Sequence, residues 1–391
     1  MSDKKNNSLK PGWRRVKFGE VVQLSKARSQ DPLADGIERY VGLEHLEPGD
    51  LRIRSWGNVA DGVTFTSIFQ PGQVLFGKRR AYQRKVAVAD FSGVCSGDIY
   101  VLETKDSEVL LPELLPFICQ TDAFFNHAVG TSAGSLSPRT NWTSLADFEF
   151  ALPPSSDQMV VVRRLSSAVE AIQALEEVKR RAGDVFESSA VQFFESTAGS
   201  WLRKKIEDVS AFVTNGFVGK SAQHYVTTGG VPYLVSKNVR RNRLKLEELT
   251  YISEEFHRSA RKSQLLEGDI LTVQSGHIGE TAVVPKDFAG ANCHALIITR
   301  PLPELLDSFF AAYYLNSKVG QRRLAQLVIG STIQHLNTSD LKKLEIPIPK
   351  IEEQKRIAAL LSEVLREQDE IDRRIEATKK LLVHLRAEVF S

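Results

Sequence analysis

The sequence predicts an α+β fold in which two similar globular domains are joined by two long antiparallel coiled-coil helices, forming an internal pseudo-twofold repeat. Three observations support this prediction. Heptad-patterned segments begin near residues 155 and 351, and each follows a proline-punctuated strand-like stretch, residues 150–154 and 346–349. Gln158 and Gln354 lie 196 residues apart, and the same shift maps Gly72 onto Gly268.

The composition fits two ordinary domains and no membrane span. The chain has 391 residues, of which 42% are hydrophobic, enough for two cores. No apolar run approaches the roughly 20 residues that a membrane helix needs, and the polar start lacks a signal-peptide core. Cys95, Cys119 and Cys293 are scattered, which favours reduced thiols in the cytoplasm over disulfides or zinc. A net charge of +3 leaves the question of nucleic acid to the charge distribution.

We predict four segments: globular residues 1–154, helical residues 155–197, globular residues 198–349 and helical residues 350–391. Apolar positions in both helical segments alternate in steps of four and three, as in a coiled coil. A lone segment of this kind favours oligomerisation, but its repetition around a domain favours an intramolecular antiparallel spacer. The predicted seam consists of Leu165, Ile172, Leu175 and Phe186 in the first helix and Ile357, Leu361, Val364, Ile371, Ile375, Leu382 and Leu385 in the second.

The two globular segments share one frame of strands and turns. Strands are predicted at residues 40–44 and 70–76 in the first segment, and at 233–237 and 266–272 in the second. Amphipathic helices are predicted near residues 114–127 and 305–327, each followed by a Gly/Ser-rich loop, 130–135 and 330–332. Matching frames with divergent loops indicate one scaffold that carries two different recognition surfaces.

Polar and cationic loops in these segments indicate nucleic acid as the ligand. Arg and Lys contact phosphates or guanine, and Asn and Gln can bond adenine. Each cluster alone is also typical of a solvated turn, but four clusters in equivalent places favour nucleic acid. The predicted DNA contacts are Lys78, Arg79, Arg80, Tyr82, Gln83, Arg84, Lys85, Arg139 and Asn141 in the first segment, and Ser236, Lys237, Asn238, Arg240, Arg241, Arg243, Gln274, His277, Gln334 and His335 in the second.

Two near-motifs for catalysis are incomplete. Residues 214–221 nearly spell a phosphate-binding P-loop, but Thr214 replaces the first glycine and no helix pattern follows. Asp90, Glu103 and Lys105 have the residue types of a metal-dependent nuclease, in a motif short enough to arise by chance. The sequence also lacks a dinucleotide fingerprint, HExxH and the Asn/Asp-Pro-Pro-aromatic motif of amino-methyltransferases. We therefore expect no catalytic, cofactor or metal site in this chain.

Residues 9–21, 40–46 and 346–357 resemble the specificity (S) subunits of type I restriction-modification systems. The third stretch is close to that family's Pro-Leu-Pro-Pro-x-x-Glu-Gln pattern, with Lys350 in place of a proline. The resemblance implies that residues 1–154 and 198–349 are target recognition domains, each reading half of a split DNA site. It also implies that the helices are conserved spacer regions whose length sets the gap between the half-sites.

The resemblance further implies a complex on double-stranded DNA. Two methyltransferase (M) subunits would bind S-adenosylmethionine and methylate adenine, and restriction (R) subunits, where present, would use ATP and Mg. Three alternatives remain open at this point: an orphan or recombining specificity subunit, a non-catalytic coiled-coil adaptor, and an enzyme that uses one of the two near-motifs.

Overall fold

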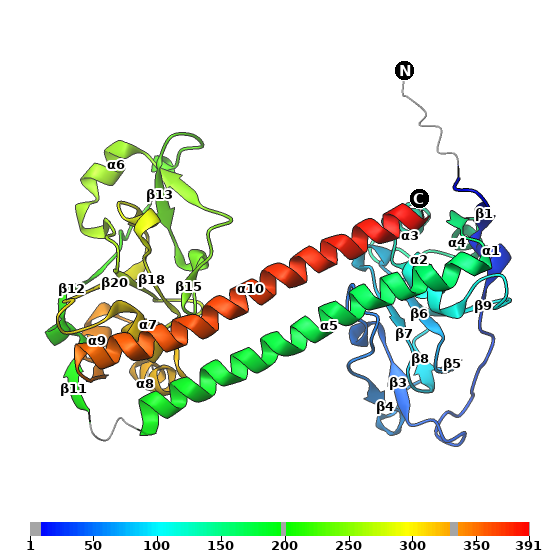
Figure 1. The fold of residues 1–391 in the computed structure, drawn as a ribbon, viewed down its shortest axis with the longest axis horizontal. Coiled ribbons are helices and arrows are strands. Elements are labelled where there is room, and N and C mark those ends of the chain that lie inside the picture. Colours follow the sequence, from blue (N-terminus) through cyan, green and yellow to red (C-terminus); the bar gives the residue numbers. More distant parts are fainter. Residues whose placement is uncertain (1–8, 197–200, 329–334, 391) are drawn as a thin grey trace. The chain divides into compact units, whose positions relative to one another are not determined.

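The computed structural model describes residues 9–196, 201–328 and 335–390. The chain divides into two compact units (Figure 1), Met1–Glu176 with Arg373–Ser391 (unit 1) and Glu177–Asp372 (unit 2). The division falls within the two long helices, α5 (Ser155–Val191) and α10 (Ile351–Phe390). Each unit therefore contains a globular part and a segment of both helices.

Unit 1 contains two four-stranded sheets and one strand pair. The first sheet is antiparallel with order β2-β9-β6-β7, and the second has order β4-β3-β8-β5 with β3 and β8 parallel. Phe69, Leu75 and Val101 belong to the core on which these strands pack. The strands are β1 (Arg14–Lys17), β2 (Val22–Leu24), β3 (Arg39–Val41), β4 (Gly57–Asn58), β5 (Ser67–Phe69), β6 (Val74–Gly77), β7 (Val86–Val88), β8 (Gly93–Cys95), β9 (Ile99–Thr104) and β10 (Glu149–Leu152), and the short helices are α1 (Phe18–Val21), α2 (Leu115–Cys119), α3 (Asp122–Gly130) and α4 (Trp142–Ala146).

Unit 2 repeats this frame. Its antiparallel sheet has order β12-β20-β17-β18, and a second sheet β16-β13-β19 again contains a parallel pair, β13 with β19. The strands are β11 (Leu202–Lys205), β12 (Ser210–Asn215), β13 (Val231–Leu234), β14 (Val239–Arg240), β15 (Arg243–Leu244), β16 (Thr250–Ile252), β17 (Ile270–Val273), β18 (Thr281–Val283), β19 (Asn292–Cys293), β20 (Leu296–Pro301) and β21 (Glu345–Ile348), and the helices are α6 (Glu254–Ser259), α7 (Ser308–Asn316), α8 (Lys318–Val328) and α9 (Thr338–Lys343). The predicted α+β class with two similar domains is confirmed.

Several predicted element boundaries are wrong, for local reasons. Strands β6 and β17 begin only at Val74 and Ile270, because Gly72 (φ 87°) and Gly268 (φ 83°) form left-handed turns before them. The predicted helix near 114–127 is broken into α2 and α3, because the Thr121 side chain caps α3 by accepting from Phe124 N. The predicted helix near 305–327 likewise divides at Ser317 into α7 and α8.

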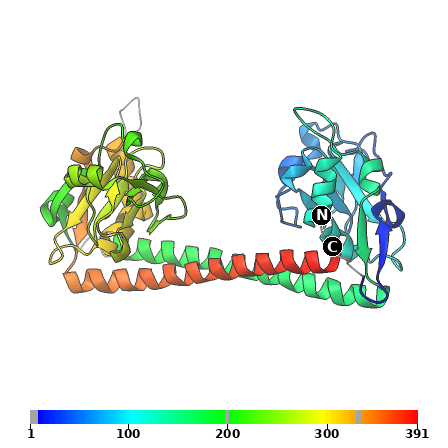
Figure 2. The ribbon, with the colours of Figure 1, turned by 90° about the horizontal axis from the view of Figure 1, so that it is seen from above.

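Within each unit the segments of α5 and α10 run side by side and antiparallel (Figure 2). In unit 2, Lys179 pairs with Asp372, and one turn later Gly183 lies against Gln368, so numbering rises on one helix as it falls on the other. In unit 1, Lys379 pairs with Glu176 at 3.7 Å. Of the predicted seam, one group is buried and the rest half-buried. The buried group is Leu165, Ile172, Phe186, Ile357, Leu361, Ile375 and Leu382, and the half-buried group is Leu175, Val364, Ile371 and Leu385.

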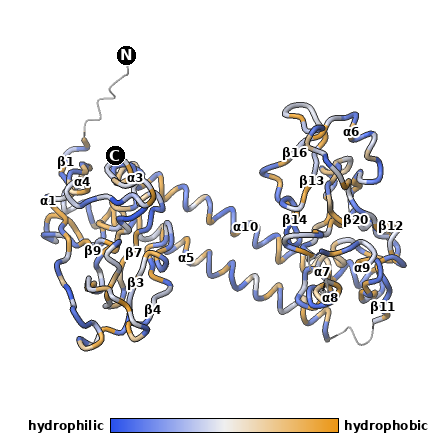
Figure 3. The backbone as a smooth tube through the Cα atoms, turned by 180° about the vertical axis from the view of Figure 1, so that it is seen from behind, coloured by the Kyte–Doolittle hydropathy of each residue, from blue (hydrophilic) through white to orange (hydrophobic). Residues whose placement is uncertain are grey.

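The seam is narrow. Both long helices are mostly hydrophilic, with hydrophobic positions at intervals (Figure 3). Phe186, Ile357 and Leu361 extend from the helices into the core of unit 2, where they pack with residues such as Phe310 and Tyr314. In the described parts of the chain, every helix is too short or too polar to cross a membrane.

Candidate nucleic-acid interface

The loop between β6 and β7 holds two arginines in a left-handed backbone conformation. Arg80 (φ 53°) and Arg84 (φ 57°) flank a single 3₁₀ turn, Ala81–Gln83. This conformation costs a non-glycine residue roughly 1–2 kcal/mol, so the surrounding structure must impose it. Ala81 is buried and anchors the turn, whereas Tyr82 is 55% exposed. The loop thus presents an aromatic side chain between two fixed cationic positions.

Asp98 organises the arginines of this surface. Its carboxylate accepts from Arg79 Nη1 at 3.1 Å and from Arg139 Nε at 2.8 Å. Burial acts to raise the pKa of Asp98, but the hydrogen bonds from Arg139 and Arg79 outweigh it and hold the pKa below its usual value. Ser137 Oγ accepts from Arg79 Nη2 at 3.0 Å and from Arg80 Nη2 at 3.2 Å. Arg79, Arg80 and Arg139 are therefore held in fixed positions around one carboxylate.

Lys78 adds a further positive charge to this group. Its Nζ lies 4.5 Å from the centre of the Tyr100 ring. Burial lowers the pKa of Lys78, and although Asp98 opposes this, nearby Arg139 and Arg28 lower it further. Lys78, Arg79, Arg80 and Arg139 gather near the single carboxylate of Asp98, and this excess of positive charge attracts phosphate. We call Lys78, Arg79, Arg80, Arg139 and Asp98 the unit 1 cationic cluster.

Other predicted contacts of unit 1 also support the fold. Arg84 pairs with Asp122 and lies 4.6 Å from the centre of the Phe125 ring. Lys85 Nζ donates to the Leu43 carbonyl at 2.7 Å, and Gln83 is half-buried. The Asn141 side chain accepts from Ser144 N and caps α4.

In unit 2, Lys237, Arg241 and Arg243 of the predicted cations are paired with carboxylates. Lys237 lies 3.3 Å from Glu248, and Arg241 lies 3.9 Å from Glu280. Arg243, on the hairpin β14–β15, lies 2.9 Å from Asp369 of α10. This surface has a weaker excess of positive charge than the unit 1 cationic cluster.

His277 and Arg240 meet at the 3₁₀ turn Ser236–Asn238. Arg240 Nη1 lies 2.7 Å from His277 Nε2 and donates to the Val239 carbonyl at 2.8 Å. His277 Nε2 also lies 2.9 Å from the Ser236 carbonyl. These contacts join two of the predicted polar clusters into one surface.

Two predicted DNA contacts are instead internal braces. Asn238 is 1% exposed, accepts from Val235 N and donates to the Lys245 carbonyl. Gln274 is 4% exposed and donates to Asn215 Oδ1 at 3.0 Å. Their polar atoms stabilise loops and do not reach the surface. His335 is exposed, and Gln334 with residues 330–332 lies outside the described residues.

The prediction that the cationic clusters occupy equivalent places is wrong. The counterpart of residues 78–85, between β6 and β7, is residues 274–280, between β17 and β18. Residues 236–238 instead correspond to the 3₁₀ turn Leu43–His45, because each turn follows the strand of a parallel pair, β3 or β13. Lys85 and His277 approach the carbonyls of Leu43 and Ser236, respectively, so both units join the same two loops through different side chains.

The near-motifs do not form sites. Residues 210–215 belong to strand β12, and residues 222–224 after the P-loop-like stretch form a short 3₁₀ turn where a phosphate-binding helix would stand. Glu103 accepts from Gln23 and Gln73, while Lys105 Nζ donates to the Gly19 carbonyl. Within the described ranges, His, Cys, Asp and Glu side chains form no group of three suited to a metal.

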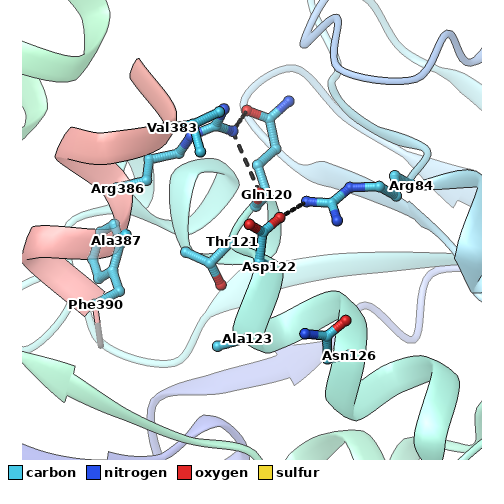
Figure 4. A pocket seen from close by; sticks show the side chains of 10 residues that line it. All are labelled: Arg84, Gln120, Thr121, Asp122, Ala123, Asn126, Val383, Arg386, Ala387 and Phe390. Atoms are coloured by element: carbon cyan, nitrogen blue, oxygen red, sulfur yellow. Dashed lines mark hydrogen bonds and ion pairs between the residues drawn. The ribbon is translucent and has the colours of Figure 1, made fainter. Parts of the chain in front are cut away.

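A cavity of about 310 Å³ in unit 1 lies where the end of α10 meets the start of α3 (Figure 4). Arg386 Nη1 donates to Gln120 Oε1 at 2.6 Å, and burial, aided by Arg84, lowers the pKa of Arg386 to about 10. Phe390 is buried beside it. The cavity is a gap in this helix–domain contact.

Sequence reasoning missed the role of Asp98 because its partners lie far away in the chain. Asp98 bonds Arg79 and Arg139, which are 19 and 41 residues distant. A single carboxylate before a strand gives no local signal of such a role.

Comparison with known proteins shows that residues 199–378 match the type I restriction modification DNA specificity domain family. The chain is 29% identical over 168 residues to the EcoDI specificity subunit of Escherichia coli, a match that covers 40% of this chain and 35% of that one. It is 22% identical to the MjaVIII specificity subunit of Methanocaldococcus jannaschii, over 95% of this chain and 91% of that one.

Two solved structures share the fold. One belongs to a study of complex assembly and conformational transition in a type I R-M system (TM-score 0.61, 20% identity, 98% of each chain). The other is the type I restriction-modification S subunit from M. genitalium (TM-score 0.63, 13% identity, 99% of this chain and 98% of that one). The match to this chain covers 35% of the length of the EcoDI specificity subunit and 60% of the length of the EcoBI specificity subunit. The chain thus spans about half the length of these curated relatives.

Proposed function

This chain belongs to the specificity (S) subunits of type I restriction-modification systems, and we propose that it selects the DNA sequence on which such a system acts. The observation that carries the proposal is the unit 1 cationic cluster. Arg79 and Arg139 are fixed by Asp98, and Arg80 by Ser137, so their remaining donors are positioned before DNA arrives. Preorganised guanidinium groups suit both phosphate and guanine contacts.

Each unit reads one half of a split site. Unit 1 reads through Lys78, Arg79, Arg80, Tyr82 and Arg139. Unit 2 reads through the exposed or half-buried members of its predicted set: Ser236, Lys237, Arg240, Arg241, Arg243, His277 and His335. Because the same frame carries different side chains in the two units, the two half-sites differ in sequence.

The paired helices set the distance between the half-sites and carry the partner subunits. The specificity-subunit family is non-catalytic, so the chemistry belongs to partners: two M subunits that bind S-adenosylmethionine and methylate adenine, and R subunits that use ATP and Mg. The chain itself is expected to bind no cofactor. Its three cysteines are buried free thiols, and burial raises the pKa of Cys95 to about 12, which suits a protein that works in the reducing cytoplasm.

The test is adenine-methylation mapping across a genome in cells that contain the partner methyltransferase, with and without this chain. We expect a split motif with a fixed unspecified spacer, present only when the chain is present. Absence of chain-dependent methylation, with a methyltransferase shown to be active, would overturn the proposal. Cells that express an Arg79→Ala/Arg139→Ala double variant serve as the internal comparison, because only one half of the motif should then lose definition.

A further inference from the structure

The loop that follows α3 projects an apolar side chain beside the unit 1 cationic cluster. Ala133 N donates to the Arg139 carbonyl and Arg139 N donates to the Ala133 carbonyl, both at 3.0 Å. This pair closes a five-residue tip, residues 134–138. Leu136 lies at its centre and is 90% exposed, more than any other large hydrophobic side chain in the described parts of the chain.

The base of this tip is attached to the cationic loop by backbone hydrogen bonds. Arg80 N donates to the Pro138 carbonyl at 2.7 Å, and Thr140 N donates to the Lys78 carbonyl at 3.0 Å. Ser137, next to Leu136, accepts from both Arg79 and Arg80. Leu136 is therefore held at a fixed place relative to the guanidinium groups.

An exposed leucine alone needs no explanation, since single surface hydrophobics are common. The setting of Leu136 distinguishes it, because the same loop is joined to a surface whose positive charge attracts phosphate. A leucine cannot donate or accept a hydrogen bond, so it cannot read the polar groups of a base. The apolar group that bases present in the major groove is the C5 methyl of thymine.

We propose that Leu136 is a specificity-determining residue that contacts the C5 methyl group of a thymine in the half-site read by unit 1. This inference rests on the proposed function. In this arrangement Arg79, Arg80 and Arg139 supply the contacts to phosphates and polar base edges, and Leu136 selects thymine over cytosine at one position.

The experiment measures binding of the full-length chain, in complex with its methyltransferase, to duplexes that carry the mapped motif. Each thymine of both half-sites is replaced in turn by deoxyuridine, which removes only the C5 methyl. For the wild type we expect one replacement to weaken binding about fourfold, the effect of one buried methyl group. Leu136→Ala should weaken binding to the thymine duplex by a similar factor and show no further loss with deoxyuridine. Leu33→Ala, which alters an exposed leucine on another loop of unit 1, should keep the wild-type response.

A Leu136→Ala variant that retains the fourfold preference for thymine would overturn the inference. So would a wild type that tolerates every deoxyuridine replacement. Loss of the methyltransferase from the purified complex, with thymine preference intact, would assign Leu136 to a protein contact instead and also overturn it. Failure of the wild type to prefer the motif over a scrambled duplex would refute the proposed function itself, and the two failures are thus distinguishable.

Discussion

Gln158 and Gln354, 196 residues apart, make the same three hydrogen bonds. Gln158 Oε1 accepts from Leu111 N at 2.8 Å, while its Nε2 donates to the carbonyls of Val109 and Pro153. The equivalent bonds of Gln354 are from Asp307 N at 2.9 Å and to the carbonyls of Leu305 and Pro349. Every partner is displaced by the same 196 residues. Each glutamine therefore ties the first turn of a long helix to its own globular part.

Replacing either glutamine should destabilise its unit. Gln158→Ala and Gln354→Ala each leave buried backbone groups without a partner, at a cost of about 1–3 kcal/mol. Because the contacts match, the two losses in unfolding free energy, measured by urea denaturation, should agree within about 1 kcal/mol. The exposed neighbour variant Lys355→Ala should change the free energy by less than about 0.5 kcal/mol. A glutamine variant as stable as that control would contradict the prediction.

The buried ion pair of unit 2 should be more costly to break. Asp269 is fully buried and accepts from Arg300 Nε and Nη2, both at 2.7 Å. Asp269→Ala removes the carboxylate partner of the Arg300 guanidinium, which keeps only the Gln264 carbonyl as an acceptor, and should cost about 3–5 kcal/mol. The matched variant is Gln73→Ala in unit 1, whose neutral side chain accepts from Gln70 N as Asp269 accepts from Leu266 N. Thermal denaturation should show a markedly smaller loss for Gln73→Ala, and equal losses would refute this account.

Asp98 should make the free energy of unfolding depend on pH in the acidic range. Its folded-state pKa lies below the ordinary value, so its contribution is fully present above the unfolded pKa of about 3.9 and is lost as pH falls through the folded pKa. The stability difference between the wild type and Asp98→Asn, measured at pH 7, 5, 4 and 3, should therefore be constant above pH 5 and shrink below about pH 4. A difference that does not change down to pH 3 would show that Asp98 is not held ionised by the arginines.

The cations of the two units should act on separate half-sites. Arg139→Ala should weaken binding by about 1–3 kcal/mol for duplexes with an intact first half-site and have little effect once that half-site is scrambled. Arg241→Ala should show the reverse dependence. Arg180→Ala, on the exposed face of α5, is the control and should bind as the wild type. Equal sensitivity of Arg139→Ala to both half-sites would contradict the division of labour.

Shortening the long helices should change the spacer and leave the half-sites unaltered. Seven residues of helix span about 10 Å, the rise of about three base pairs. Removal of one heptad from both α5 and α10 should therefore give a methylation motif with the same half-sites and a gap shorter by about three base pairs, or an inactive complex. An active complex with the original gap would disprove the spacer role.

The repeat and the class of fold could be predicted because both produce regular patterns over long stretches of the sequence. The 196-residue shift and the heptads predict the duplication, and the turns at Gly72 and Gly268 explain why strand ends were misplaced. The sequence shows which loops are rich in Arg and Lys, but it does not show which contacts hold these side chains in place. Asp98 collects arginines from distant positions, and Asn238 is drawn inward by backbone groups of its own loop. The same polar residue types occur at surfaces that bind a ligand and in hydrogen bonds that stabilise a loop from inside. Only the folded structure distinguishes the two roles.

The backbone carbonyls of Leu43 and Ser236 allow the loops that contact them to vary in sequence. Both serve as the attachment point for the neighbouring hairpin loop, yet a lysine reaches one and a histidine the other. A backbone oxygen exists whatever the residue, so substitution at either position does not remove it. The loops that meet this oxygen can differ in length, charge and sequence without altering the sheet beneath. A short surface segment can therefore be replaced at this point of either unit while the sheets that carry it are kept.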